Sequence, residues 1–203
     1  MLFNEIVASI CKMFGYDDIN VEVVFEDALN SPYFDSETNI VHLVKRDGIL
    51  LWNLVYQFSH EYLHYMFQIH SKGQNKDDSR WIEEIVCEAF SIYCLTLYCI
   101  EEGRYWHGYL YHNFYILNRN IESCKPIKGL GNLNFALSGY KEMNTRQFIH
   151  PVVLRILKII EMNYKQLLDM LDLTKFVSGN EITGIHDNEI ISILSDFQYQ
   201  IML

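Results

Sequence analysis

Residues 48–69, GILLWNLVYQFSHEYLHYMFQI, decide how the rest of the chain is interpreted. Apolar residues recur in this segment with helical periodicity, the turn-forming pair Asp47 and Gly48 stands at its start, and a polar run follows it. These features predict an α-helix. Within the helix, residues 60–64 (HEYLH) place two histidines four positions apart. Such residues lie about 40° apart around the axis and about 6 Å apart along it, so both imidazoles can point at one ion.

The chemistry of these side chains points to zinc. His60, Glu61 and His64 lie in an apolar, aromatic segment, where each would be costly to bury without a partner or an ion. Zn²⁺ prefers neutral imidazole and carboxylate groups, and three protein ligands leave a position for a water molecule whose pKa falls to roughly 7. The sequence therefore predicts Zn²⁺ as cofactor, with Glu61 accepting a proton from the zinc-bound water.

A second helix, predicted for residues 79–102, carries the acidic side chains that could complete the site. Glu84 follows His64 by 20 positions, and Glu88 lies one turn further on the same face. One carboxylate can bind the metal and the other can orient a histidine through its second ring N–H, a task for which Glu88 is well placed. Glu83 is expected to point to another side, toward solvent.

Taken together, these residues resemble the gluzincin metallopeptidases, the family of the thermolysin-like endopeptidases and the zinc aminopeptidases. The resemblance rests on residues 60–64, on the spacing to Glu84, on the Trp-x-x-Glu pattern of residues 81–84 and on Glu88. It covers roughly residues 39–100, about half of the chain. Two departures are that residues 85–87 are Ile-Val-Cys instead of smaller residues, and that no Gly-x-Met-Glu-Asn segment is present to hold a free amino terminus.

The resemblance implies a role for each residue of the candidate site. His60, His64 and Glu84 would bind zinc, Glu61 would be the general base, and Glu88 would support a histidine ligand. The implied activity is that of a zinc metallopeptidase acting on a peptide or protein substrate. Cleavage specificity, and whether the enzyme is an endopeptidase or an exopeptidase, stay open.

Two further expectations concern the substrate. By the same resemblance, the strand that contains Ile40, Val41 and His42 would be the sheet edge along which an extended peptide lies. The family also stabilises the oxyanion with a Tyr or His beyond the third ligand, and His150 is our first candidate because it precedes Pro151, where a helix is predicted to begin. The other candidates for the oxyanion donor are Tyr105, His107, Tyr109, His112 and Tyr140.

An alternative third ligand is His70, six positions after His64. Metzincin peptidases use a histidine at this spacing, with a glycine midway that turns the chain. Here the midway residue is Phe67, so the helix has no easy break and would carry His70 away from the metal. We therefore favour Glu84 and expect His70 at the carboxyl end of the helix.

The predicted fold is α+β, with a small N-terminal mixed β-sheet, a pair of active-site helices and a mainly α-helical C-terminal part. Residues 1–103 would form a zincin-like metal-binding core, and residues 104–203 a helical subdomain that completes the cleft. The other predicted elements are strands at 21–25 and 40–44, turns at 30–33 and 35–37, a loop at 125–132, and helices at 2–15, 151–172 and 187–201.

Composition narrows the possible partners and the compartment. The net charge is −10, with 16 Lys and Arg against 26 Asp and Glu, which disfavours nucleic acid as a partner. Five cysteines in no scaffold-like spacing disfavour a disulfide framework and indicate a reducing compartment. The N-terminus has no signal-peptide pattern, and the apolar run 85–100 is short and interrupted by Glu88. We therefore expect a cytoplasmic protein with no membrane partner.

Three classes of function fit these observations. The first is the zinc peptidase described above. The second is a zinc-binding module, or an inhibitory or interaction protein, that keeps the zincin fold with little or no catalysis. The third is a helical interaction protein in which the histidine motif arises by chance. Zinc content separates the third class from the other two, and peptide hydrolysis with and without a chelator separates the first from the second.

Overall fold

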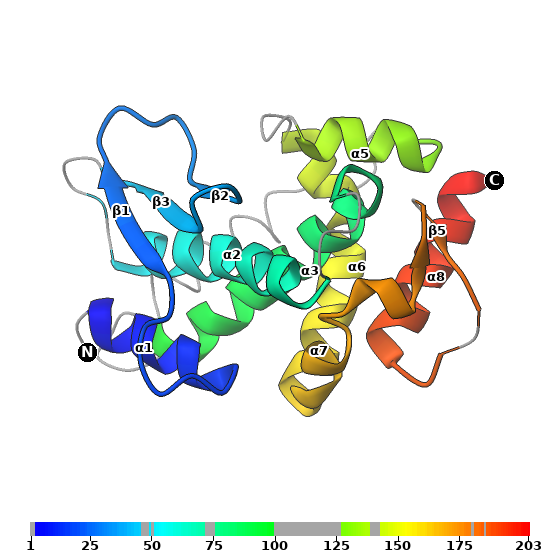
Figure 1. Cartoon of the computed structure of the whole chain (residues 1–203). Helices are drawn as coiled ribbons and strands as arrows, with labels where there is room; N and C mark the ends of the chain where they lie inside the picture. The colour runs from blue at the N-terminus through cyan, green and yellow to red at the C-terminus, as the bar shows by residue number, and fades with distance from the viewer. Residues whose placement is uncertain are drawn as a thin grey trace.

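The computed structural model describes residues 3–45, 49, 51–71, 76–99, 127–138, 143–179, 181–184 and 186–203. Figure 1 shows a small sheet near the N-terminus and a larger helical part that extends to the C-terminus on the opposite side of the molecule. The sheet contains both parallel and antiparallel strand pairs. The predicted α+β class, with an N-terminal mixed sheet and a mainly helical remainder, is confirmed.

Three strands form the sheet: β1 (Glu22–Glu26), β2 (Tyr33–Asp35) and β3 (Ile40–Val44). Their order is β1-β3-β2, with β1 parallel and β2 antiparallel to β3. Along β3, Val41 and Leu43 are fully buried, as expected from the alternation of side chains across a strand. These residues form the face of the sheet that packs against the helices.

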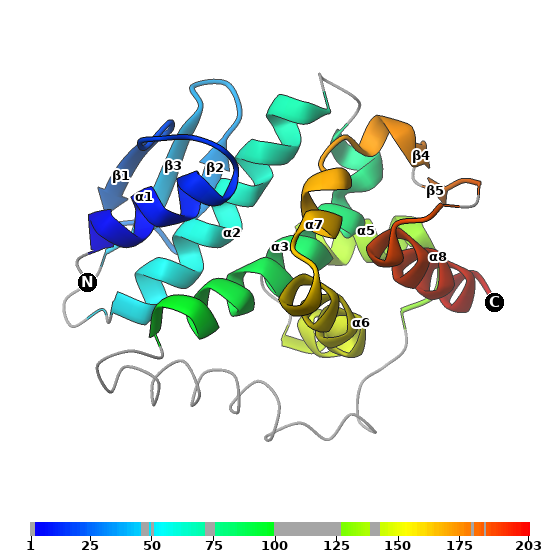
Figure 2. The same ribbon diagram turned by 90° about the horizontal axis from the view of Figure 1, so that it is seen from below.

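The helix α2 (Leu51–His70) lies between the sheet and the helix α3 (Lys76–Cys99), as the two views in Figures 1 and 2 show. Helix α2 is buried from Val55 to His64 because it has neighbours on both sides. Its link to the sheet includes Gln57, whose side-chain oxygen accepts a 2.8 Å hydrogen bond from the backbone N–H of Val44. The central helix pair is therefore fixed to the sheet by a polar contact as well as by apolar packing.

The other described elements are α1 (Phe3–Met13), α5 (Leu130–Ser138), α6 (Met143–Met162), α7 (Lys165–Asp169), a 3₁₀ turn (Leu173–Lys175), β4 (Val177–Ser178), β5 (Glu181–Ile182) and α8 (Glu189–Met202). Helix α1 packs against α2. Helix α6 lies against α3 and α5, and α8 packs against α6 (Figure 2).

The helix boundaries in this part differ from those predicted. Helix α6 begins at Met143, so Pro151 lies in its interior and not at its start. The predicted helix 151–172 is divided between α6 and α7, and α5 begins at Leu130, within the predicted loop. Proline in a helix interior removes one hydrogen bond, but the buried side chains on both sides of it, such as Ile149 and Val153, keep α6 packed on α3.

Two expectations about the whole chain have different outcomes. The predicted division after residue 103 falls within residues 100–126, outside the described residues, and stays a prediction. Among the helices that the structure does describe, none combines the length and the apolar character that crossing a membrane requires.

Candidate metal centre

Helices α2 and α3 bring together the three side chains that the sequence nominated as metal ligands. His60 and His64 lie on α2 and Glu84 lies on α3, and all three are at least 94% buried. One ligand atom from each residue can be chosen so that all three atoms lie within 4.8 Å of one another. Glu61 is also buried, with 2% of its surface exposed. The predicted grouping of two histidines with a later glutamate is therefore present in the structure.

The separations between these side chains suit a tetrahedral metal site. The Nε2 atom of His60 lies 3.2 Å from Oε2 of Glu84, and Nε2 of His64 lies 3.4 Å from Oε1 of Glu84. Zinc bonds to nitrogen and oxygen of about 2.0 to 2.2 Å require ligand atoms about 3.3 to 3.6 Å apart at tetrahedral angles. The two helices thus hold the donor atoms close to the spacing that one small divalent cation needs.

The hydrogen bonding of His64 also fits coordination by its Nε2 atom. Its Nδ1 atom lies 3.2 Å from Oε2 of Glu83, and an N–H there would donate to this carboxylate. The Nε2 atom is buried and has no hydrogen-bond partner among the described residues. When one ring nitrogen donates to a carboxylate, the other nitrogen presents its lone pair, which is the usual arrangement of a metal-binding histidine.

Glu83 thus contradicts the expectation that it faces solvent. Its surface is only 8% exposed, and it supports His64 from the same helix that carries Glu84. The reason is that α3 is enclosed on all sides in this region, since every residue from 81 to 92 is buried. A helix with no solvent-facing side has no exposed position for Glu83, and the carboxylate instead turns toward the imidazole.

Glu88 lies on the His60 side of the cluster. Its Oε2 atom is 4.0 Å from Nδ1 of His60, which is longer than a hydrogen bond, and it accepts a hydrogen bond from the hydroxyl of Tyr56. Arg146 of α6 approaches the same carboxylate at 3.8 Å and donates to the Tyr56 hydroxyl at 3.2 Å. Glu88 is therefore placed near His60, and its predicted role in orienting that ring stays a prediction.

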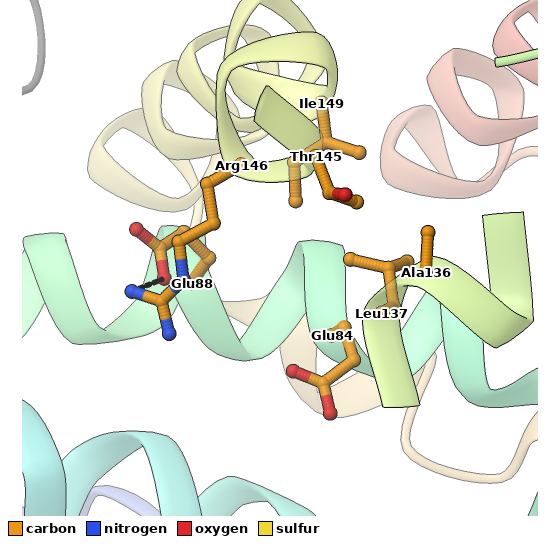
Figure 3. A pocket seen from close by; sticks show the side chains of 7 residues that line it. All are labelled: Glu84, Glu88, Ala136, Leu137, Thr145, Arg146 and Ile149. Carbon is orange, nitrogen blue, oxygen red and sulfur yellow. Dashed lines mark ion pairs between the residues drawn. The ribbon is translucent and has the colours of Figure 1, made fainter. Parts of the chain in front are cut away.

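Figure 3 shows Glu84 and Glu88 side by side on α3, with Arg146 reaching from α6 to Glu88. A small pocket of about 20 Å³ opens beside these two carboxylates, which is room for about one water molecule. The pocket therefore leaves room for a water molecule beside Glu84. The side chains that line the pocket are Glu84, Glu88, Ala136, Leu137, Thr145, Arg146 and Ile149.

The charges of the cluster hold the pKa values of two ligands away from their ordinary values. Burial is the largest influence on His64 and would lower its pKa, but Cys87, Glu84 and Glu83 together hold that pKa well above its usual value. Burial would likewise raise the pKa of Glu84, but His64, His60 and Arg80 hold it well below its usual value. Without a metal ion, a proton on His64 thus helps to balance the Glu84 carboxylate.

A formal charge count shows what a cation would change. The charged side chains gathered around the two histidines are Glu61, Glu83, Glu84, Glu88, Arg80 and Arg146. Four carboxylates and two guanidinium groups leave a formal charge of −2 when both imidazoles are neutral. A divalent cation would balance this charge, and buried charges without such balance are strongly unfavourable.

The strand expected to form the substrate edge is in the centre of the sheet, which corrects that prediction. Ile40, Val41 and His42 belong to β3, which pairs with β1 on one side and with β2 on the other. The short strand β2 causes the difference, because residues 33–35 join the sheet where the sequence indicated turns. The backbone of Ile40, Val41 and His42 is therefore occupied on both sides, and the edge strands of the described sheet are β1 and β2.

The candidates for the oxyanion donor have varied outcomes. His150 is 6% exposed and lies inside α6, so the reason for preferring it, a position at the start of a helix, is wrong. Its proposed catalytic role is not tested by the structure and stays a prediction. The other candidates, Tyr105, His107, Tyr109, His112 and Tyr140, lie outside the described residues.

The alternative metal ligand His70 is exposed at the end of α2, outside the metal-ligand group.

The structure adds four residues that the sequence analysis did not select. Tyr56 and Arg146 contact Glu88, Arg80 forms an ion pair with Glu84, and Cys87 lies against His64. The spacing of Arg80, one turn before Glu84, was a usable signal because side chains four apart on a helix are neighbours. Arg146 gave no such signal, since its contact with Glu88 depends on how α6 packs against α3.

Comparison with known proteins adds no further support, because no family model matches the chain and no curated protein or solved structure is significantly similar to it. The interpretation of the site therefore depends on the geometry of its own residues.

Proposed function

We propose that the chain is a zinc-dependent hydrolase, most specifically a peptidase in which Glu61 activates water. The observation that carries the proposal is the buried group of His60, His64 and Glu84, with Glu61 buried beside His60 on the same helix. Two imidazoles and one carboxylate are the protein ligands of a catalytic zinc site, whereas calcium and magnesium favour sites made of oxygen atoms alone. The donor set therefore supports zinc.

The residues around the ion have different roles in the proposed reaction. A zinc ion held by the three ligands would lower the pKa of water to roughly 7 and polarise a carbonyl group. Glu61 follows His60 in sequence and is rotated by about 100° around the helix, so it can accept a proton without joining the ligands. After the water oxygen bonds to the carbonyl carbon, Glu61 returns the proton to the amide nitrogen and the C–N bond breaks. The products are a carboxylic acid and an amine, which exchange a proton to give a carboxylate and an ammonium group.

The chemistry of the whole chain supports a peptide as substrate. A net charge of −10 favours neutral or basic peptides over nucleic acid, which needs clustered cations. Three cysteines of the described part of the chain, Cys11, Cys87 and Cys94, are buried and unbridged. Unbridged thiols support a reducing compartment, so we propose a cytoplasmic location.

The experiment that tests this proposal measures zinc and hydrolysis on the same preparation. Purified protein should contain one zinc per chain and should cleave members of a broad peptide library. A chelator should stop cleavage, and added zinc should restore it. Zinc content near zero after growth and refolding with added zinc would contradict the proposal as a whole. One zinc per chain without cleavage of any peptide would contradict the proposed peptidase activity.

A second candidate function is that of a zinc-binding or interaction module that does not turn over a substrate. The pocket described beside Glu84 favours it, because about 20 Å³ is room for about one water molecule. Such a module would bind zinc with the same three ligands. It would show no chelator-sensitive cleavage across the library, so the same experiment separates the two functions.

A further inference from the structure

Arg80 occupies a position in the site that metal binding alone does not require. It lies on α3 one turn before Glu84, and its Nη2 atom is 2.5 Å from Oε1 of Glu84. It also interacts electrostatically with Glu61, the candidate general base. Its side chain remains 34% exposed, so Arg80 lies between the buried ligands and the solvent. Arg80 therefore contacts the metal ligand Glu84 and interacts electrostatically with the candidate base.

The guanidinium group has hydrogen-bonding capacity beyond its contact with Glu84. Arginine carries five N–H donors, and only one nitrogen is used in the ion pair with Glu84. The Nε atom of Arg80 is buried and has no hydrogen-bond partner among the described residues. A buried N–H without an acceptor is unfavourable, so a working site should supply an oxygen atom at this place.

We propose that Arg80 is a catalytic residue that donates a hydrogen bond to the carbonyl oxygen of the amide under attack. The proposal rests on the proposed hydrolase function. When the water oxygen bonds to the carbonyl carbon, its proton passes to Glu61 and the π electron pair of the C=O bond moves onto the carbonyl oxygen. The Arg80 N–H stabilises that negative charge until the C–N bond breaks. The electron pair on the oxygen then re-forms the C=O bond, and the pair of the C–N bond leaves with the nitrogen, which takes the proton from Glu61.

The geometry favours Arg80 over the donor expected from the sequence. Its ion pair with Glu84 fixes the guanidinium beside the metal ligands, whereas His150 lies inside α6 and is 6% exposed. The guanidinium group is also permanently charged, because arginine is not deprotonated in proteins. A fixed cation that needs no reorganisation during the reaction is the most effective partner for a developing oxyanion.

A competing role for Arg80 is that it only orients the Glu84 carboxylate. The two roles give different results in zinc-loaded full-length protein titrated calorimetrically with methylphosphonate, a tetrahedral anion that imitates the oxyanion. The variants are Arg80→Met, which removes charge and donors, and Arg80→Lys, which keeps the charge near Glu84 but lacks the Nε donor. Arg155→Met is the matched control, because Arg155 is 51% exposed and pairs with Asp196 at 3.6 Å, away from the metal group.

If Arg80 donates to the anion, Arg80→Met should retain one zinc per chain and bind methylphosphonate at least about tenfold more weakly than the unmodified chain. Arg80→Lys should also retain zinc and lose several-fold in affinity, and Arg155→Met should bind unchanged. With a cleavable peptide, the turnover number should fall in Arg80→Met while KM changes little.

Two results would overturn the proposal. Unchanged methylphosphonate affinity in either Arg80 variant would show that Arg80 does not face the anion, and loss of zinc from Arg80→Lys would show that Arg80 serves Glu84 instead. Because anion binding is measured without turnover, a chain that binds zinc but cleaves no peptide would remove the peptidase proposal and still give a separate result for Arg80.

Discussion

In the part of the chain that the structure describes, two regions bring a histidine to a carboxylate, and they differ in burial and in the number of charged groups. On the sheet, Nδ1 of His42 contacts Glu26, and the His42 ring stacks on Tyr33 at 4.4 Å between centroids. The Glu26 side chain there is 36% exposed. Between α2 and α3, two histidines meet Glu84, whose side chain is only 7% exposed.

The difference shows what separates a cation site from an ordinary ion pair. Water around Glu26 screens its charge, so the pair with His42 needs no third partner. At Glu84 the surrounding protein excludes water, and the carboxylates of the cluster outnumber its guanidinium groups. A buried excess of negative charge beside imidazole lone pairs favours the binding of a cation. The pair on the sheet has no such buried excess of charge.

The largest expected effect is the loss of zinc when one ligand of the buried cluster is removed. His60→Ala, His64→Ala and Glu84→Ala should each reduce zinc from one per chain to near zero, because two ligands cannot hold the ion against water. His42→Thr on the sheet and His70→Ala at the end of α2 should keep full zinc content. Elemental analysis of purified protein measures the result. Retention of zinc by Glu84→Ala together with its loss from His70→Ala would mean that His70 is the third ligand.

The second-largest expected effect is a fall in the turnover number of Glu61→Gln without loss of metal. Glu61→Gln keeps the size of the side chain but removes the proton acceptor, so zinc and fold should persist while hydrolysis falls by about 10² to 10⁴. Zinc content and peptide cleavage are measured on one preparation. Hydrolysis at the original rate in the zinc-loaded variant would refute the proposed mechanism. Loss of zinc would instead make Glu61 a ligand or a structural carboxylate.

Much of the ligand group could be predicted because it depends on local geometry. The spacing of His60 and His64 fixes their common direction once α2 is a helix, and the same holds for Glu84 and Glu88 on α3. The residues that the sequence missed depend on packing between distant elements. Arg146 reaches Glu88 only because α6 lies on α3, and no periodicity within either helix contains that information.

Two of the wrong expectations, those about Glu83 and β3, have the same origin. Glu83 was expected in solvent because a helix of mixed composition usually has one exposed face, but here neighbouring elements enclose α3 from residue 81 to residue 92. Strand β3 was expected at the edge of the sheet, but β2 pairs with it on that side. Strand β2 has three residues, and its pairing depends on tertiary contacts and not on its own propensity. Patterns within one element predicted its type, and its neighbours decided its exposure.

A smaller effect is expected from the carboxylate that supports His64. Glu83→Gln should weaken zinc binding by about 10- to 100-fold, equivalent to about 1.4 to 2.7 kcal/mol, because the neutral amide orients the imidazole less firmly. Competition with a chromogenic chelator measures the dissociation constant. The matched control is Glu26→Gln, which alters the carboxylate of the pair on the sheet and should leave zinc affinity unchanged. Equal affinities in Glu83→Gln and the unmodified chain would show that Glu83 does not support a ligand.

The smallest effect is expected at the His42–Glu26 pair on the sheet, and it tests whether this pair is independent of the buried cluster. His42→Thr removes both the contact with Glu26 and the stacking on Tyr33, while threonine suits a strand. Cross-strand pairs and exposed ion pairs each contribute up to about 1 kcal/mol, so the free energy of unfolding should fall by about 1 kcal/mol or less. Urea unfolding of the zinc-loaded chain measures the change. A loss larger than about 2 kcal/mol, or any accompanying loss of zinc, would show that the sheet pair is coupled to the buried cluster through α2, and the distinction between a screened pair and a cation site would then fail.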